Sequence, residues 1–223
     1  LSGPLSSPDF DGRIAISEGR FFNAPLGTRV EQLAMTLEAD QAGGRIDGSF
    51  VAGEGRAELR GDLDLDAPGG WRGNLALDGN DLRLFNVDWL ELTASPDLSL
   101  GFQAELLEIN GGIDIDRARL GLPPGSEQRV AVSPDVVVEG RQDPAEAEEA
   151  LPRRDIVGNV RIGLSDDVRF AAAGLETNVA GELELEWVRQ KTLPTARGTV
   201  NLVDGSYSAY GQNLQVSEGR VVF

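Results

Sequence analysis

The sequence contains no cysteine and no histidine among its 223 residues. Without cysteine the chain can form no disulfide, zinc–thiolate centre or iron–sulfur site, and it has no thiol nucleophile. Without histidine it has no Ser–His triad and no imidazole ligand for a metal. These absences remove the commonest catalytic and metal-binding arrangements. We therefore expect neither an enzyme nor a protein that holds a cofactor.

Positive charge is scarce as well. The chain has 20 basic and 37 acidic residues, which gives a net charge of −17. Binding to nucleic acid needs a basic patch that neutralises phosphates, so this balance argues against a nucleic-acid partner. The same balance opposes simple electrostatic docking on anionic lipid.

Long hydrophobic runs are also missing. The longest apolar stretches, Phe170–Leu175 and Val136–Val138, are far shorter than the roughly 20 residues of a membrane-spanning helix. The chain starts at Leu1 without a methionine and stops at Phe223 within an apolar alternation. We therefore expect a fragment, residues 1–223, of a longer protein.

The dominant pattern that is present has a period of two. From Arg56 to Asp66 the even positions are charged and the odd positions are leucine, alanine or glycine. The stretch Gly181–Trp187 repeats the alternation with three glutamates on the other face. Since side chains alternate between the faces of a strand, each run predicts one charged face and one apolar face.

Glycine-containing turn signals separate these runs, and they predict antiparallel hairpins. They are Glu18-Gly19, Gly43-Gly44, Pro68-Gly69-Gly70, Asp78-Gly79, Asn110-Gly111-Gly112, Asp204-Gly205 and Glu218-Gly219. The pattern predicts an all-β protein of about fifteen strands without a long helix. The stretch 86–92 could be a short helix or a bulged strand. A change of apolar phase at Asp116–Arg117 predicts a β-bulge.

Two further segments have a distinct character. Residues 140–155 combine acidic and basic residues with two prolines and show no alternation, so we expect a mobile loop there. The segment 12–22 repeats in 198–208, with the shared order glycine, any, apolar, any, apolar, any, acidic, glycine, any, aromatic. This repeat favours an elongated, repetitive sheet.

Acidic residues are the remaining candidates for chemistry. The triplet Asp62, Asp64 and Asp66 has the start of a calcium-loop spacing, but Ala67 and Gly73 stand where that loop needs glycine and glutamate. A solvated strand face explains the triplet better, and we expect no metal site. A carboxylate pair that hydrolyses glycosides is left open as a minor alternative, because so many acidic residues bring some pair close.

The apolar face has two possible uses. Two leucine-rich sheets could cover each other as a sandwich. Alternatively, since no amphipathic helix is predicted that could cover the face, one sheet could curl into a trough open to ligands. In that second case the inward positions of the clearest strands line the trough and contact lipid: Leu59, Leu63, Leu65, Leu75, Leu77, Phe102, Phe170, Leu183, Leu185 and Trp187.

The C-terminal third resembles a known family. The run 158–175, the segment 177–186 and the run 196–223 are similar to segments of the TamB proteins, and Gly205–Leu214 with its Tyr-Gly-Gln-x-Leu is the most specific part. The upstream residues agree in repeat style alone. The resemblance implies no catalytic motif.

The resemblance implies a long, mainly antiparallel sheet curled into a taco-like trough with an apolar interior. It also implies a periplasmic protein anchored to the inner membrane before Leu1, which carries phospholipid acyl chains towards the outer membrane. The implied protein partner is TamA, an outer-membrane barrel of the Omp85 type linked to autotransporter assembly, through a region beyond Phe223.

Two other roles remain open besides this lipid conduit. The sheet could act as a chaperone-like scaffold that offers strand edges to barrel proteins. It could also be a plain structural solenoid or adhesin module.

Overall fold

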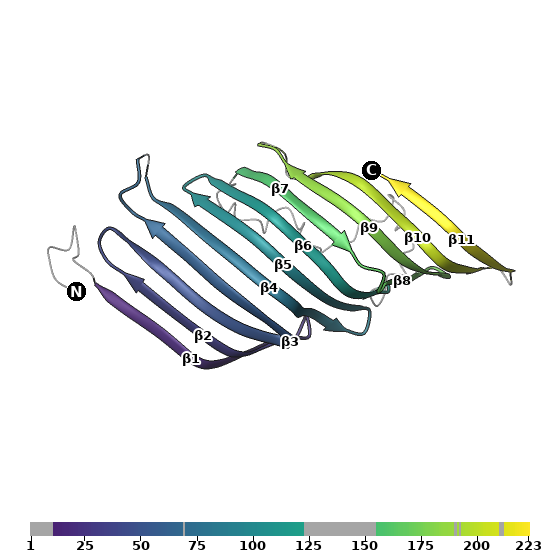
Figure 1. Ribbon diagram of the computed structural model, residues 1–223, viewed down its shortest axis with the longest axis horizontal. Helices are drawn as coiled ribbons and strands as arrows, with labels where there is room; N and C mark the ends of the chain where they lie inside the picture. Colours follow the sequence, from purple (N-terminus) through teal and green to yellow (C-terminus); the bar gives the residue numbers. More distant parts are fainter. Residues whose placement is uncertain (1–10, 69, 123–154, 190, 192, 210–211) are drawn as a thin grey trace, which may run out of the picture.

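The computed structural model describes residues 11–68, 70–122, 155–189, 191, 193–209 and 212–223, and it consists of a single β-sheet (Figure 1). The described residues form no helix. The strands are β1 (Gly12–Asn23), β2 (Thr28–Ala39), β3 (Gly43–Asp64), β4 (Arg72–Val87), β5 (Leu90–Gln103), β6 (Leu106–Leu120), β7 (Asp155–Leu164), β8 (Val168–Ala172), β9 (Leu175–Trp187), β10 (Thr195–Ala209) and β11 (Gln212–Val222).

Strand order follows the chain from one edge of the sheet to the other. The order is β1-β2-β3-β4-β5-β6-β7-β9-β10-β11, and the short β8 pairs with β6 and β9. All neighbours are antiparallel except β6, which runs parallel to β7 and β8. The predicted all-β, mainly antiparallel sheet is therefore confirmed. In Figure 1, β1 and β11 form its two opposite edges.

Strand β3 doubles back on itself, which adds a hairpin between β2 and β4. The Leu65 amide donates to the Ala42 carbonyl (2.8 Å), so the two ends of the strand lie side by side. A Cβ added to Gly61 would lie 2.9 Å from Ile46 Cγ2, which places the two halves in contact. The reversal occurs at Gly53, whose φ of 69° is the left-handed conformation that glycine adopts without strain.

A line of irregularities crosses the sheet, and we call it the crease. It consists of the register shifts at 17–18, 32–33, 54–55, 79–81, 116 and 204–205, together with the break between β7 and β8 at 165–167. Four crease residues other than glycine adopt the left-handed conformation: Glu18 (φ 56°), Gln32 (φ 51°), Asp81 (φ 51°) and Asp204 (φ 51°). Because bulges bend strands, the crease divides the sheet into two parts.

The shorter part, which we call the short flap, comprises residues 19–23, 28–31, 82–87, 90–94, 117–120, 168–172, 175–178, 205–209 and 212–216. The remaining strand residues form the long flap. The β3 hairpin ends at the crease, so β2 meets β4 directly within the short flap. There the Asn86 amide donates to the Leu26 carbonyl (2.9 Å), and the Thr28 hydroxyl donates to the Leu84 carbonyl.

The small core of the sheet lies along this crease. Among the described residues, five of the eight fully buried hydrophobic side chains are within two residues of a crease position, and a sixth, Ala94, is paired with one of them, Leu82; the five are Ala52, Ala57, Leu82, Ala118 and Val168. Phe50 and Leu77 of the long flap pack against Ala52, Ala57 and Leu82, together with Leu84 of the short flap. Side chains on both sides of the crease therefore bury the small residues between them.

A series of hydrogen bonds fixes the crease across three strands and the connection between β7 and β8. The Ser95 hydroxyl accepts from the Asp81 amide (3.0 Å) and donates to the Asp116 carboxylate (2.7 Å). The Ser165 hydroxyl donates to the Asp116 carbonyl (2.6 Å). The bulge predicted at Asp116–Arg117 is confirmed, since Thr93 pairs with Arg117 while Ala94 pairs with Ile115.

Several expected turns are wrong. The pairs Glu18-Gly19, Asp78-Gly79, Asp204-Gly205 and Glu218-Gly219 lie inside β1, β4, β10 and β11, and Asn110–Gly112 lies inside β6. An acidic residue followed by glycine can supply a bulge as well as a turn, because both need one residue at positive φ. This explains why the part of the chain that the structure describes forms eleven strands, whereas about fifteen were expected over the whole sequence.

Two other local expectations have different outcomes. Residues 86–92 form neither a helix nor a bulged strand, because β4 ends at Val87 and β5 begins at Leu90. The loop expected at 140–155 lies outside the described residues up to position 154, and Asp155 is the first residue of β7.

The crease generates a prediction about Asp81. An L-residue in the left-handed region costs roughly 1–2 kcal/mol, and β-branched residues are the least tolerant. We expect Asp81→Val to lower the free energy of unfolding by about 1–2 kcal/mol relative to Asp81→Gly. Urea denaturation followed by tryptophan fluorescence measures both variants.

The matched control is Asp97 on β5, which lies in regular strand directly opposite Asp78. Valine favours regular strand and glycine weakens it, so Asp97→Val should be more stable than Asp97→Gly, the reverse of the order at Asp81. The same order of stability at both sites would contradict the bulge at Asp81.

Candidate functional site

One face of the sheet carries apolar side chains in rows that cross the strands. Directly paired residues share a face, so the pairings trace each row. The first row runs through Leu59, Leu77, Leu98, Gly111, Val160 and Leu185. The second runs through Gly61, Leu75, Leu100, Ile109, Gly158 and Trp187.

Glycine alternates with large side chains along these rows. Gly158 lies between Ile109 and Trp187 with a φ of 136°, and a Cβ there would lie 1.8 Å from the Ile109 carbonyl oxygen. The backbones come this close because no side chain separates them.

The ten residues predicted to line a trough follow this face. Nine belong to strands: Leu59 and Leu63 of β3, Leu75 and Leu77 of β4, Phe102 of β5, Phe170 of β8, and Leu183, Leu185 and Trp187 of β9. Phe170 joins them through its pairing with Leu120 and Thr177. Leu65 lies just beyond the end of β3. Their contact with lipid stays a prediction.

None of these ten side chains is fully buried. Leu63 and Leu65 are each 38% exposed, and the other eight are half-buried. Neighbouring strands cover the flanks of such side chains, whereas full burial needs a second layer on top. Within the part of the chain that the structure describes, no second layer covers this face. The sandwich interpretation therefore fails for the described residues.

Sequence reasoning missed several members of the same rows. Leu98, Leu100, Ile109, Ile113 and Ile162 occupy equivalent positions in β5, β6 and β7. The alternation in these strands was visible, but their phase relative to β4 and β9 depends on the pairing register. The crease residues were also missed, although the repeated acidic–glycine pair in 12–22 and 198–208 marks the crease in β1 and β10.

The opposite face, which we call the outer face, carries charged side chains, several of which form ion pairs between neighbouring strands. Arg161 of β7 bridges Asp114 of β6 (2.9 Å) and Glu182 of β9 (3.4 Å). The hydrogen bond from Arg161 to Asp114 and the charge of that carboxylate raise the pKa of Arg161, and Glu182 adds to the effect. Solvent screens such exposed pairs, so they align strands more than they stabilise the fold.

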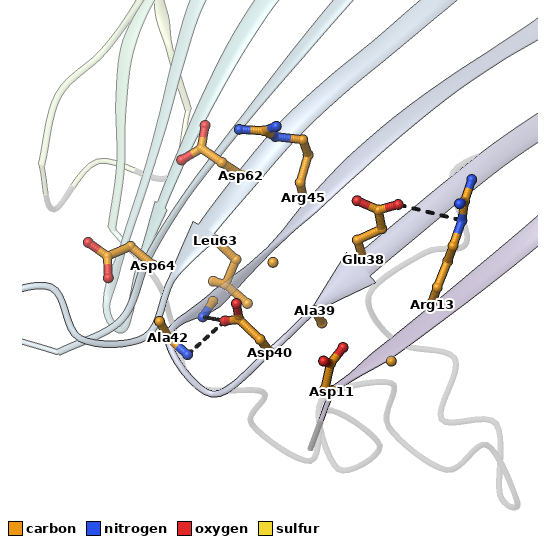
Figure 2. Close-up of a pocket in the computed structure, with 13 residues that line it drawn as sticks. Asp11, Arg13, Glu38, Ala39, Asp40, Ala42, Arg45, Asp62, Leu63 and Asp64 are labelled. Carbon is orange, nitrogen blue, oxygen red and sulfur yellow. Dashed lines mark hydrogen bonds and ion pairs between the residues drawn. The ribbon is translucent and has the colours of Figure 1, made fainter. Parts of the chain in front are cut away.

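A shallow acidic hollow lies at one end of β1, β2 and β3 (Figure 2). Its carboxylates already serve the local structure. Asp40 Oδ1 accepts the amides of Ala42 (2.9 Å) and Gly43 (3.0 Å), and Glu38 pairs with Arg13 (3.5 Å). These contacts close the β2–β3 turn and join β1 to β2.

Two carboxylates of the acidic triplet at the end of β3 also accept hydrogen bonds from neighbouring residues. Asp62 Oδ2 accepts from Asn74 Nδ2 (3.2 Å), and Asp64 Oδ1 accepts from the Asp66 amide (3.0 Å). Among the described residues, no three acidic side chains lie in an arrangement that could hold a metal ion. Nor does the described part of the chain include a helix long and apolar enough to cross a membrane.

Comparisons with known proteins agree with the resemblance of the sequence to the TamB proteins. The family model described as the TamB C-terminal domain matches residues 40–223. The Translocation and assembly module subunit TamB of Haemophilus influenzae (strain ATCC 51907 / DSM 11121 / KW20 / Rd) is 29% identical over 152 residues. That match covers 62% of this chain and 11% of the relative, so the chain spans about a ninth of the relative's length. No solved structure matches.

The family model reaches from the end of β2 to the last residue and so covers more than half of the chain. It includes the apolar rows, most of the crease and all the residues predicted to line the trough. The chain belongs to the TamB family, in its C-terminal domain.

Proposed function

We propose that this sheet is a segment of a TamB-like protein that shields phospholipid acyl chains on its apolar face during their transport between the inner and outer membranes. The observation that carries the proposal is the set of continuous, half-exposed apolar rows. A soluble sheet rarely leaves such a face uncovered, and a large exposed apolar surface marks a binding site.

The dimensions of the rows support a lipid ligand. Each row crosses six neighbouring strands spaced about 4.8 Å apart, so it extends over about 24 Å. This length exceeds about 15 Å, which is half of the roughly 30 Å hydrocarbon core of a bilayer and the share of one acyl chain. An extended acyl chain can therefore lie along a row and stay in contact with apolar side chains over its whole length.

The energetics also favour acyl chains. Each methylene removed from water contributes about 0.8 kcal/mol, so a half-shielded chain gains several kcal/mol without specific polar contacts. Burial along the crease supports a bend towards the apolar face, because small residues are covered from both sides where a surface is concave. Such a bend would form the trough.

The relative suggests the cellular context in which this lipid transport takes place. The name of that relative assigns it to the translocation and assembly module. We propose that the present chain works in that module too, in the periplasm, with support of outer-membrane protein and autotransporter assembly and with TamA as the barrel partner. The many carboxylates on the outer face of the long flap suit a segment that stays in water while its other face holds lipid.

A second candidate function rests on the edges of the sheet. Within the described residues β1 and β11 each pair on one side alone, with β2 and β10. Such edges can accept an added strand, as in the scaffold hypothesis for barrel proteins. A barrel-derived strand peptide that protects β1 amides from hydrogen exchange, without displacing lipid, would favour this function.

The lipid proposal predicts opposite behaviour of two neighbouring positions on β5. Leu100 lies in an apolar row between Leu75 and Ile109, and Ser99 lies on the outer face between Ala76 and Asn110. A buried unpaired charge is costly, so Leu100→Arg should reduce phospholipid retained on the purified protein by about tenfold or more. Ser99→Arg should leave retention unchanged.

Native mass spectrometry of both variants measures the retained phospholipid. Circular dichroism checks that each remains folded, since the face is half wet and tolerates an arginine better than a closed core does. Equal retention in the two folded variants, or the absence of phospholipid from the unmodified protein after reconstitution, would rule out the apolar face as the lipid site.

A further inference from the structure

The short flap carries an unusual share of positive charge on its outer face. Elsewhere in the described chain carboxylates outnumber basic residues by more than two to one. The short flap and its turns reverse this balance, with four carboxylates (Glu31, Asp88, Glu91 and Glu176) against six arginines: Arg20, Arg29, Arg83, Arg117, Arg119 and Arg169. We call these six arginines the basic band.

The pairing register puts the basic band on one face. Arg83, Thr93 and Arg117 are paired in sequence across β4, β5 and β6, while the adjacent Leu82 and Ala94 are buried on the other face. Arg119 is paired directly with Arg169 of β8. Arg29 is paired with Phe22, and the adjacent Val30 is paired with the buried Ala52. Residues far apart in sequence thus meet on the outer face.

The band is incompletely neutralised by the protein itself. Arg117 is paired with Asp167 (2.8 Å) and Arg119 with Glu91 (2.9 Å). Among the described residues, no carboxylate forms an ion pair with the other four arginines. Like charges directly opposite each other destabilise a sheet, as for Arg119 and Arg169. An anionic partner would relieve this repulsion.

The surroundings of the band fit phosphate groups at a lipid surface. Guanidinium groups bind phosphate oxygens in a bidentate manner. A hollow between Arg83 and Arg117 also presents Asn86 and Thr93, which can donate further hydrogen bonds. Exposed aromatic rings lie at the same end of the strands: Phe22 is 55% exposed, with the Arg29 guanidinium 5.7 Å from the ring centroid, and Trp89 is 37% exposed. Aromatic rings beside basic residues are typical of membrane–water interfaces.

We propose that the basic band binds the phosphate groups of an anionic phospholipid surface, so that the outer face of the short flap lies on the membrane. This goes beyond the acyl-chain site, because it uses the other face of the sheet. The net charge of −17 argues against such docking only if charges act over the whole molecule. Glu54, Asp81 and Asp167 act on Arg117 at close range. Since screening limits exposed charges to about 8–10 Å at physiological salt, the more distant carboxylates of the long flap do not cancel the band.

The test uses sedimentation of the intact 223-residue chain with vesicles of phosphatidylcholine alone or mixed with phosphatidylglycerol. We expect binding to the mixed vesicles, weaker binding at high salt, and little binding to phosphatidylcholine alone. In the double variant Arg83→Gln/Arg169→Gln, binding to mixed vesicles should fall about tenfold or more. The matched control Arg45→Gln/Arg220→Gln removes the same charge from the outer face of the long flap and should fall far less.

Equal losses in the two double variants would overturn the proposal, as would equal binding to both kinds of vesicle. Native mass spectrometry of the phospholipid carried by Arg83→Gln/Arg169→Gln separates this result from the acyl-chain site. Because the band lies on the other face, this variant should keep its bound lipid. Loss of vesicle binding together with loss of carried lipid would assign the arginines to the acyl-chain site and would likewise contradict the proposal.

Discussion

The hydrogen-bonded register between neighbouring strands is the interaction on which the rest of this structure depends. An alternating strand has two unlike faces by itself, but a shift of one residue in pairing would mix charged and apolar rows. Here every residue in the two traced apolar rows is leucine, isoleucine, valine, glycine or tryptophan, from β3 through β9. The cross-strand ion pairs of Arg161 and the hydrogen bonds of Ser95 and Asp116 hold that register from the outer face. A continuous apolar surface follows without a conventional core.

The crease gives this sheet its buried side chains, which in a β-sandwich a second layer would provide. Bulges at Glu18, Gln32, Asp81 and Asp204 place the irregular residues of different strands on one line, and small side chains become buried beside it. Strain of left-handed residues costs free energy in each strand, and packing of Phe50, Leu77 and Leu84 around Ala52 and Ala57 offsets it. The two sides of the crease then differ in charge as well as in length. The long flap is acidic on its outer face, while the short flap gathers arginines that the sequence keeps apart.

Much of the architecture could be predicted from the sequence, because a period of two is a local property. The alternation of 56–66 and 181–187 predicted strands, one apolar face and the residues on it, and the change of phase at Asp116 predicted a bulge. The meaning of an acidic–glycine pair could not be read locally, because the backbone conformation of Asp204-Gly205 suits a hairpin turn as well as a bulge within β10. The parallel pairing of β6 with β7, the doubling of β3 and the grouping of Arg83, Arg117 and Arg169 all depend on contacts between distant residues. The net charge of the chain could not reveal that grouping, because it does not say where the charged residues lie.

The central claim is that acyl chains lie on the apolar face and not on the outer face of the long flap. Methyl spectra of the isotopically labelled protein, recorded with a phospholipid that carries a spin label on its acyl chain, test this claim directly. Methyl signals of Leu59, Leu77 and Leu185 on the apolar face should broaden, whereas those of Val157, which lies on the outer face opposite Glu108, should stay sharp. Broadening of Val157 to the same extent as the three leucines, or sharp signals from all four, would contradict it.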